Sequence, residues 1–177
     1  MDNTMLEKMC ARRSVRNYSG EPVPMEALNA ILEAGLLSPS GRAVRPWEMI
    51  VIRDKKMLIE LSSCRMGGAA RMLAGADAAI VVVGNEEQSD VWTEDCSIVM
   101  SNMHLMASAL GVGSCWIQGR LREAMDGDTT EGFVQKLLRF PSEYRLEAIL
   151  SLGMPESAPA PHSLEELRFD KIHIGKW

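Results

Sequence analysis

The stretch Arg12-Arg13-Ser14-Val15-Arg16-Asn17-Tyr18 places three guanidinium groups and one hydroxyl within five residues of a chain whose formal net charge is −5. Guanidinium groups bind phosphate oxygens through paired hydrogen bonds, and a serine hydroxyl adds a neutral donor. The alternative interpretation is a solvated basic turn that follows a short helix. The run alone is compatible with both interpretations, and a second stretch separates them.

The second stretch is Ser38-Pro39-Ser40-Gly41-Arg42-Ala43-Val44-Arg45-Pro46-Trp47, and its Ser-Pro-Ser-Gly start ends a preceding helical pattern. The two stretches together resemble the nitroreductase family of flavin enzymes. That family carries an R-R-S-x-R-x-[FY] run, then V-P, a helix that ends in P-S, and a Q-P-W before a strand. Further matches fall at residues 110–119, 152–155 and 171–177, so the ordered set spans nearly the whole chain.

The resemblance implies an FMN-dependent NAD(P)H oxidoreductase, a flavoprotein in which NADH or NADPH delivers hydride to N5 of FMN. An acceptor such as a nitroaromatic, a quinone or another electrophile then uses the same site, which gives ping-pong kinetics. The family assembles as a homodimer with FMN at the interface. Three alternatives stay open: a flavin-binding carrier or sensor without fast turnover, a specialised member for reductive dehalogenation or flavin destruction, and a protein that binds another phosphorylated ligand.

The resemblance also assigns cofactor-binding residues in three groups, while the flavin itself carries the chemistry and no side chain is expected to be catalytic. The first group holds the phosphate, and its Arg16 is also expected near the pyrimidine edge of the flavin. The second group reaches the flavin bound mainly by the other subunit, and the third presents backbone groups to the N5–O4 edge, where a glycine permits close approach. These groups are Arg12, Arg13, Ser14 and Arg16; Pro39, Ser40, Gly41 and Arg45; and Ile117, Gln118 and Gly119.

Two residues depart from the family pattern. Ala43 stands where many relatives have Asn, and Arg45 stands where they have Gln. Ala43 cannot make the side-chain hydrogen bond to the flavin ring that Asn makes, and Arg45 adds a charge that suits an anionic substrate, the reduced flavin or a carboxylate neighbour. These departures leave the acceptor and the choice between NADH and NADPH open.

Composition excludes several other classes of function. The chain has 177 residues, which predicts one domain, 1–177, with a C-terminal arm at about 154–177. The acidic net charge argues against a nucleic-acid partner. The four cysteines are scattered without a C-x-x-C pair, so no zinc or iron–sulfur site is expected. No signal peptide or membrane-spanning run is visible, and we therefore expect a cytoplasmic protein without a membrane partner.

Hydrophobic periodicity predicts an α+β fold, because strands and helices mix without strict alternation. The family implies a three-layer α/β/α arrangement around a central mixed or antiparallel sheet, in a homodimer with an exchanged C-terminal arm. Residues 91–110 are apolar almost all round, which predicts a buried helix, with Gly111 as its C-cap and His104 in the core or dimer seam. Helices are expected at 4–11, 25–37, 55–63, 91–110 and 131–139, a helical turn at 121–125, and strands at 49–52, 78–84, 114–117 and 146–152.

Overall fold

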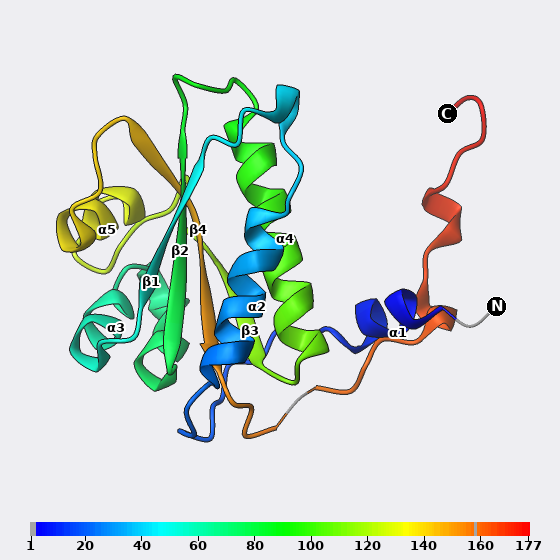
Figure 1. Ribbon diagram of the computed structural model, residues 1–177, viewed down its shortest axis with the longest axis horizontal. Coiled ribbons are helices and arrows are strands. Elements are labelled where there is room, and N and C mark those ends of the chain that lie inside the picture. The colour runs from blue at the N-terminus through cyan, green and yellow to red at the C-terminus, as the bar shows by residue number, and fades with distance from the viewer. Residues whose placement is uncertain (1–2, 158) are drawn as a thin grey trace.

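The computed structural model describes residues 3–157 and 159–177, and its centre is a four-stranded sheet (Figure 1). The strands lie in the order β1-β2-β4-β3, and every neighbouring pair is antiparallel. Their bounds are Trp47–Ile52 for β1, Ala78–Asn85 for β2, Gly113–Gln118 for β3 and Tyr144–Gly153 for β4. The predicted sheet is thus confirmed as antiparallel, with β3 at one edge.

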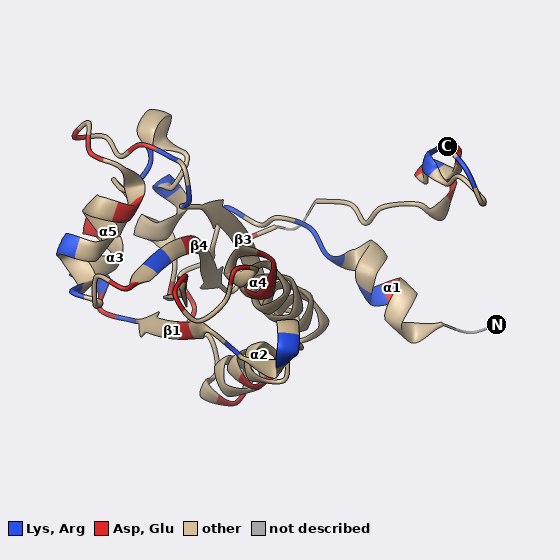
Figure 2. Ribbon diagram, turned by 90° about the horizontal axis from the view of Figure 1, so that it is seen from above, with Lys and Arg blue, Asp and Glu red and all other residues tan. Residues whose placement is uncertain are grey.

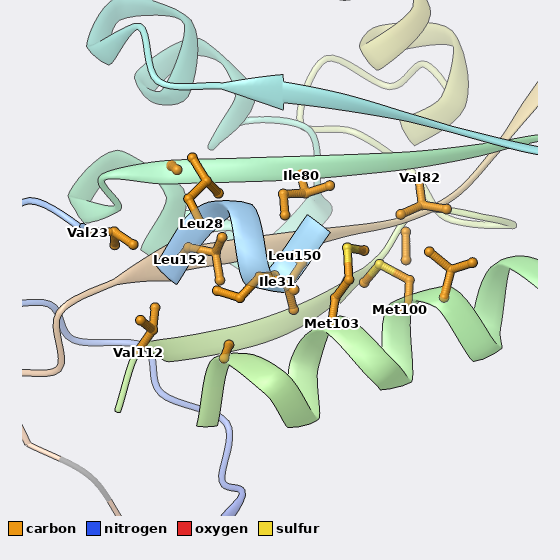
Figure 3. Close-up of a cluster of buried hydrophobic side chains, with 14 of the residues drawn as sticks. Val23, Leu28, Ile31, Ile80, Val82, Met100, Met103, Val112, Leu150 and Leu152 are labelled. Atoms are coloured by element: carbon orange, nitrogen blue, oxygen red, sulfur yellow. The ribbon is translucent and has the colours of Figure 1, made fainter. Parts of the chain in front are cut away.

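Helices cover both faces of this sheet, which confirms the three-layer α+β fold (Figure 1). On one face lie α2 (Met25–Leu36) and α4 (Trp92–Ala109), and Figure 3 shows their Leu28, Ile31, Met100 and Met103 packed on the sheet. The other face carries α3 (Lys55–Leu61), α5 (Thr130–Leu138) and the 3₁₀ turns η2 (Met66–Gly68) and η3 (Arg71–Gly75). All eight residues of β2 are buried, as expected for an apolar strand that is covered on both faces.

The helix α4 is long and mostly buried, and it determines where the site residues lie. It buries residues along its whole length, from Asp95 in the first turn to Ala107 near the end. Gly111 has a φ of 75°, so it takes the left-handed conformation predicted for the residue that ends this helix. Among the described residues no helix combines the length and the apolarity needed to cross a membrane.

The helix α1 (Thr4–Ala11) and the C-terminal arm project together from the body of the molecule (Figure 1). None of the residues of α1 is buried, and the arm is exposed throughout the described residues from 156 to 177. The short 3₁₀ turns η4 (Leu164–Glu166) and η5 (Phe169–Lys171) are the regular elements of the arm. Its apolar side chains include Phe169, Ile174 and Trp177, and the last of these is fully exposed.

One predicted element is wrong. Residues 121–125 form a loop and not a helical turn, with Glu123 in an isolated antiparallel bridge to Thr129. Leu121 lies in the left-handed region with a φ of 56°, which prevents a right-handed helix from starting there. The other predicted helices and strands are present, with ends that differ by up to two residues.

Candidate functional site

The run Arg12–Tyr18 begins at the outer edge of β3 and continues to the segment that follows β4, where Tyr18 pairs with Pro155. Ser14 forms a parallel bridge with Ser114, and the N–H of Val15 donates to the carbonyl of Ser114 over 2.9 Å. Val15 is buried, and the hydroxyl of Tyr18 donates to its carbonyl over 3.0 Å. Because these apolar residues anchor the run to the sheet, the alternating Arg16 side chain is left exposed.

A cavity of about 410 Å³ opens beside this run. Two guanidinium groups and two hydroxyls line the same space, from Arg16 and Arg71 and from Ser14 and Ser157, which is a donor set suited to a dianionic phosphate. Arg71 comes from η3 and was missed by sequence reasoning, because a single arginine ahead of a strand carries no distinguishing pattern. The cavity is lined by Ser14, Val15, Arg16, Asn17, Arg71, Ser157 and Pro159.

Arg12 and Arg13 point to different partners. One terminal nitrogen of Arg12 lies 2.8 Å from Nε2 of His104 on α4. The guanidinium group of Arg13 donates instead to the carbonyl of Ala160 in the C-terminal arm. The N–H of His162 donates to the carbonyl of Cys10 over 2.9 Å, so the arm is fastened to the end of α1 at this residue. Basic residues lie on the segment that joins α1 to the sheet (Figure 2).

The edge strand β3 presents some of its backbone groups outward. The N–H of Gly119 donates to the carbonyl of Glu147 on β4 over 3.0 Å, and backbone groups alternate in direction along an antiparallel ladder. The backbone N–H and C=O groups of residues 113, 115, 117 and 119 therefore point toward β4. Those of residues 114, 116 and 118 point to the open edge of the sheet. The outward carbonyls of Ser114 and Gln118 do accept from outside the sheet, from Val15 and from the guanidinium group of Arg65.

Of the predicted group Ile117–Gly119, the register thus leaves the N–H of Gln118 at the open edge. The N–H of Gly119 is already bonded within the sheet. Glycine is needed at this position for a different reason, since a Cβ here would lie 2.5 Å from Cδ2 of Leu146. The missing side chain therefore makes room for the core, a role that the sequence does not reveal.

Glu147 lies behind Gln118 at a β-bulge in β4, where the register against β2 shifts between Val82 and Val83. The carboxyl group is buried, and its Oε1 lies 3.4 Å from both the amide of Gln118 and the hydroxyl of Ser97. Burial raises the pKa of Glu147, because the charged form loses its hydration. The sequence does not reveal this residue, because a single glutamate within an apolar strand predicts a side chain that faces solvent.

The segment Pro39–Arg45 is a tight loop held at the other end of α4. The N–H of Gly41 donates to the buried carboxylate of Asp95 over 2.8 Å, and the N–H of Arg45 donates to the hydroxyl of Ser40 over 2.9 Å. Arg42, Ala43 and Arg45 all have positive φ values of 53–56°, which is unusual for residues other than glycine and asparagine. Such strain is typical of functional loops.

The two ends of α4 keep these groups apart within one chain. Gly41 contacts Asp95 and Arg12 contacts His104, and these two anchors are nine residues apart on α4. At 1.5 Å per residue, the separation along the helix is about 13 Å. No residue of the Pro39–Arg45 loop is among those that line the Ser14 cavity.

All four cysteines are free, and three of them are buried. Cys64, Cys96 and Cys115 are buried free thiols, and burial raises the pKa of each, to about 12 for Cys64. Cys10 is partly exposed and also free. In the described part of the chain, no group of three or more His, Cys, Asp or Glu side chains is placed to hold a metal ion.

Comparisons with known proteins agree with this geometry. The model of the nitroreductase family matches residues 10–65 and 60–154. A relative from Archaeoglobus fulgidus, provisionally named NADH dehydrogenase/NAD(P)H nitroreductase, is 35% identical over 97% of this chain and 98% of its own length.

Two solved structures share the fold over nearly their whole length. An FMN-dependent nitroreductase from Clostridium difficile is 39% identical, with a TM-score of 0.94 over 97% of this chain and 99% of its own. A provisionally named nitroreductase from Desulfovibrio desulfuricans, solved in complex with FMN, is 27% identical with a TM-score of 0.75 over 98% and 99% of the two chains. The chain belongs to the nitroreductase family.

Proposed function

We propose that this protein is an FMN-dependent NAD(P)H oxidoreductase of the nitroreductase type. The observation that carries the proposal is the pairing of two features on one edge of β3: the cavity of Ser14, Arg16 and Arg71, and the outward N–H of Gln118. Ser14 pairs with Ser114, four residues before Gln118, so the two features lie about 13 Å apart along the strand. A phosphate at one end and a ring system at the other, joined by a ribityl chain, fit that spacing.

The residues of the chain bind and orient the cofactor. Arg16, Arg71 and Ser14, which line the cavity, would hold the phosphate. We assign Arg12, two residues before Ser14, to the same anion from outside the cavity lining. The N–H of Gln118 is a fixed donor for the N5–O4 edge of the ring, because the ladder to β4 sets its direction. Bound FMN would supply the hydride-transfer chemistry between NADH or NADPH and a nitroaromatic, quinone or other electrophilic acceptor.

The binding site is proposed to be complete only in a homodimer. Following the family resemblance, we assign the contact of the Pro39–Gly41 loop to the FMN of a second copy; within its own chain the loop is anchored at Asp95, about 13 Å along α4 from His104. The exposed apolar side chains of α1 and of the arm, such as Met9, Phe169 and Trp177, supply surface for that copy to cover. The arm, residues 154–177, would cross onto the partner, and the whole chain 1–177 would act as one domain. Light scattering should give twice the mass of the chain.

The phosphate assignment is tested by replacing its donors one at a time. Arg16→Ala should weaken FMN affinity by about one to two decades, since losing a charge-assisted hydrogen bond costs about 1.5–3 kcal/mol. Ser14→Ala should give a smaller loss, because its hydroxyl is neutral. Lys56→Ala, an exposed cation on α3, is the matched control and should keep full affinity. Full FMN retention in the Arg12, Ser14 and Arg16 alanine variants alike would refute the placement of the phosphate.

Turnover separates this proposal from a flavin carrier or sensor. A shared donor and acceptor site gives parallel lines in double-reciprocal plots at several acceptor concentrations, and intersecting lines would contradict it. A carrier would bind FMN equally well and show negligible reduction by NADH and NADPH in rapid mixing. The buried, free cysteines fit the reducing environment of the cytoplasm, where we place the protein.

A further inference from the structure

The side chain of His104 is buried where α4, β3 and the segment after α1 meet. It extends from α4 and is only 7% exposed. Its Nε2 lies 2.8 Å from a terminal nitrogen of Arg12, just after α1. Its Nδ1 lies 2.7 Å from the hydroxyl of Ser114 on β3, the residue that pairs with Ser14.

These two contacts determine the state of the imidazole ring. A guanidinium group only donates hydrogen bonds, so Nε2 of His104 must be the acceptor and carry no proton. The proton of the neutral ring then lies on Nδ1 and is donated to the hydroxyl of Ser114. Ser114 is itself fixed within the sheet, which gives the ring one orientation and its acceptor one direction.

This arrangement constrains Arg12 strongly. An arginine side chain has several rotatable bonds, so holding it in one conformation costs conformational entropy. A buried neutral acceptor holds the guanidinium group in place without neutralising its positive charge. A carboxylate at the same place would form an ion pair and cancel the attraction of Arg12 for a phosphate. A neutral histidine leaves the charge and the remaining N–H donors free for an anion.

We propose that His104 is a positioning residue that orients Arg12 for the phosphate of FMN. Ser114 holds the imidazole ring in its neutral form, and the ring accepts a hydrogen bond from Arg12. The inference rests on the proposed function, because it takes FMN as the anion. His104 itself touches neither the phosphate nor the ring in this arrangement, and it acts through Arg12.

Two conservative substitutions distinguish positioning from a simple packing role. In His104→Gln the side-chain oxygen reaches the place of Nε2 and can still accept from Arg12. In His104→Asn the shorter amide reaches only the place of Nδ1, so contact with Ser114 is kept and contact with Arg12 is lost. Both variants place a neutral amide in the same buried site, and they differ in which partner they can reach.

The test measures the dissociation constants of FMN and riboflavin for the full-length protein by fluorescence quenching. Riboflavin lacks the phosphate, so its affinity reports folding and the ring site. We expect His104→Asn to bind FMN about tenfold more weakly with unchanged riboflavin affinity, and His104→Gln to stay within a few-fold of wild type. In an Arg12→Ala background, His104→Asn should cause no further loss of FMN affinity.

The outcomes separate this inference from the function on which it rests. If the wild type binds FMN no more tightly than riboflavin, the proposed function fails and the role of His104 fails with it. If the wild type prefers FMN and His104→Asn keeps that full preference, the function stands and the positioning role is overturned. Equal losses in the Asn and Gln variants, or loss of both ligands together, also overturn it, because they indicate packing alone. Ser114→Ala offers a second variant with little risk to folding, and it should lower FMN affinity several-fold without changing riboflavin affinity.

Discussion

Acidification should destabilise the protein through His104. Burial, with the neighbouring charge of Arg12 as a smaller cause, lowers the pKa of His104 from 6.5 to about 4. The unfolded chain therefore binds a proton in the range between these two values while the folded chain does not. The contribution of this group to stability is fully present above pH 6.5 and is lost as the pH falls toward 4.

The magnitude follows from the size of the shift. A difference of about 2.5 pKa units corresponds to about 3 kcal/mol once the group is protonated in both states. Between pH 7.5 and pH 5 the loss is about 2 kcal/mol, because the folded-state histidine is still mostly neutral at pH 5. For a chain of this size, that amounts to about 4–8 °C in the midpoint of thermal unfolding.

The assay compares the wild type with His104→Gln, which cannot titrate in this range, by urea unfolding at pH 7.5 and pH 5. The stability difference between the two proteins should change by about 2 kcal/mol between these pH values, in favour of the variant at pH 5. All other titrating groups are common to both proteins and cancel. His173→Gln, in the exposed arm, is the control and should follow the wild type. A difference that does not change with pH would refute the buried, neutral state of His104.

Three further substitutions test the geometry around the site. Gly119→Ala should cost about 1–3 kcal/mol of unfolding free energy, measured by urea unfolding, because the added Cβ overlaps Leu146 at 2.5 Å; an unchanged midpoint would contradict the packing of this turn. Ala43→Asn should raise stability by a few tenths of a kcal/mol, because asparagine tolerates the left-handed conformation better, and a lower thermal midpoint would count against that backbone. Asp95→Ala should lower the free energy of unfolding by about 1–3 kcal/mol, because the N–H of Gly41 loses its acceptor. Proteolysis of the 39–45 loop should become faster. A cleavage rate equal to that of the wild type would contradict the role of Asp95 in holding this loop.

The layers of the fold could be predicted because local patterns determine them. The consecutive apolar residues of β2 indicated a strand covered on both faces, and Gly111 marked the end of α4. The Arg12–Tyr18 run stood out as a basic segment by its local pattern, and its Ser14 and Arg16 line one cavity in the structure.

The contacts that complete the site join residues far apart in sequence, and no local pattern reveals them. Arg12 and His104 are 92 residues apart, so the partner of the first arginine could not be read from its surroundings. The choice of Gln118 over Gly119 as the outward donor depends on the register of β3 against β4, which is set by the whole ladder. Residues 121–125 looked helical by composition, but Leu121 takes a backbone conformation that its sequence does not favour.

The most direct test of the central claim is the visible absorption spectrum of the purified protein, recorded before and after anaerobic addition of NADH or NADPH. We expect flavin bands, either in the protein as isolated or after incubation with FMN, and we expect these bands to bleach when one of the two donors is added. A protein that stays colourless after incubation with FMN would contradict the proposed cofactor. Flavin bands that neither donor bleaches would contradict the proposed NAD(P)H oxidoreductase activity.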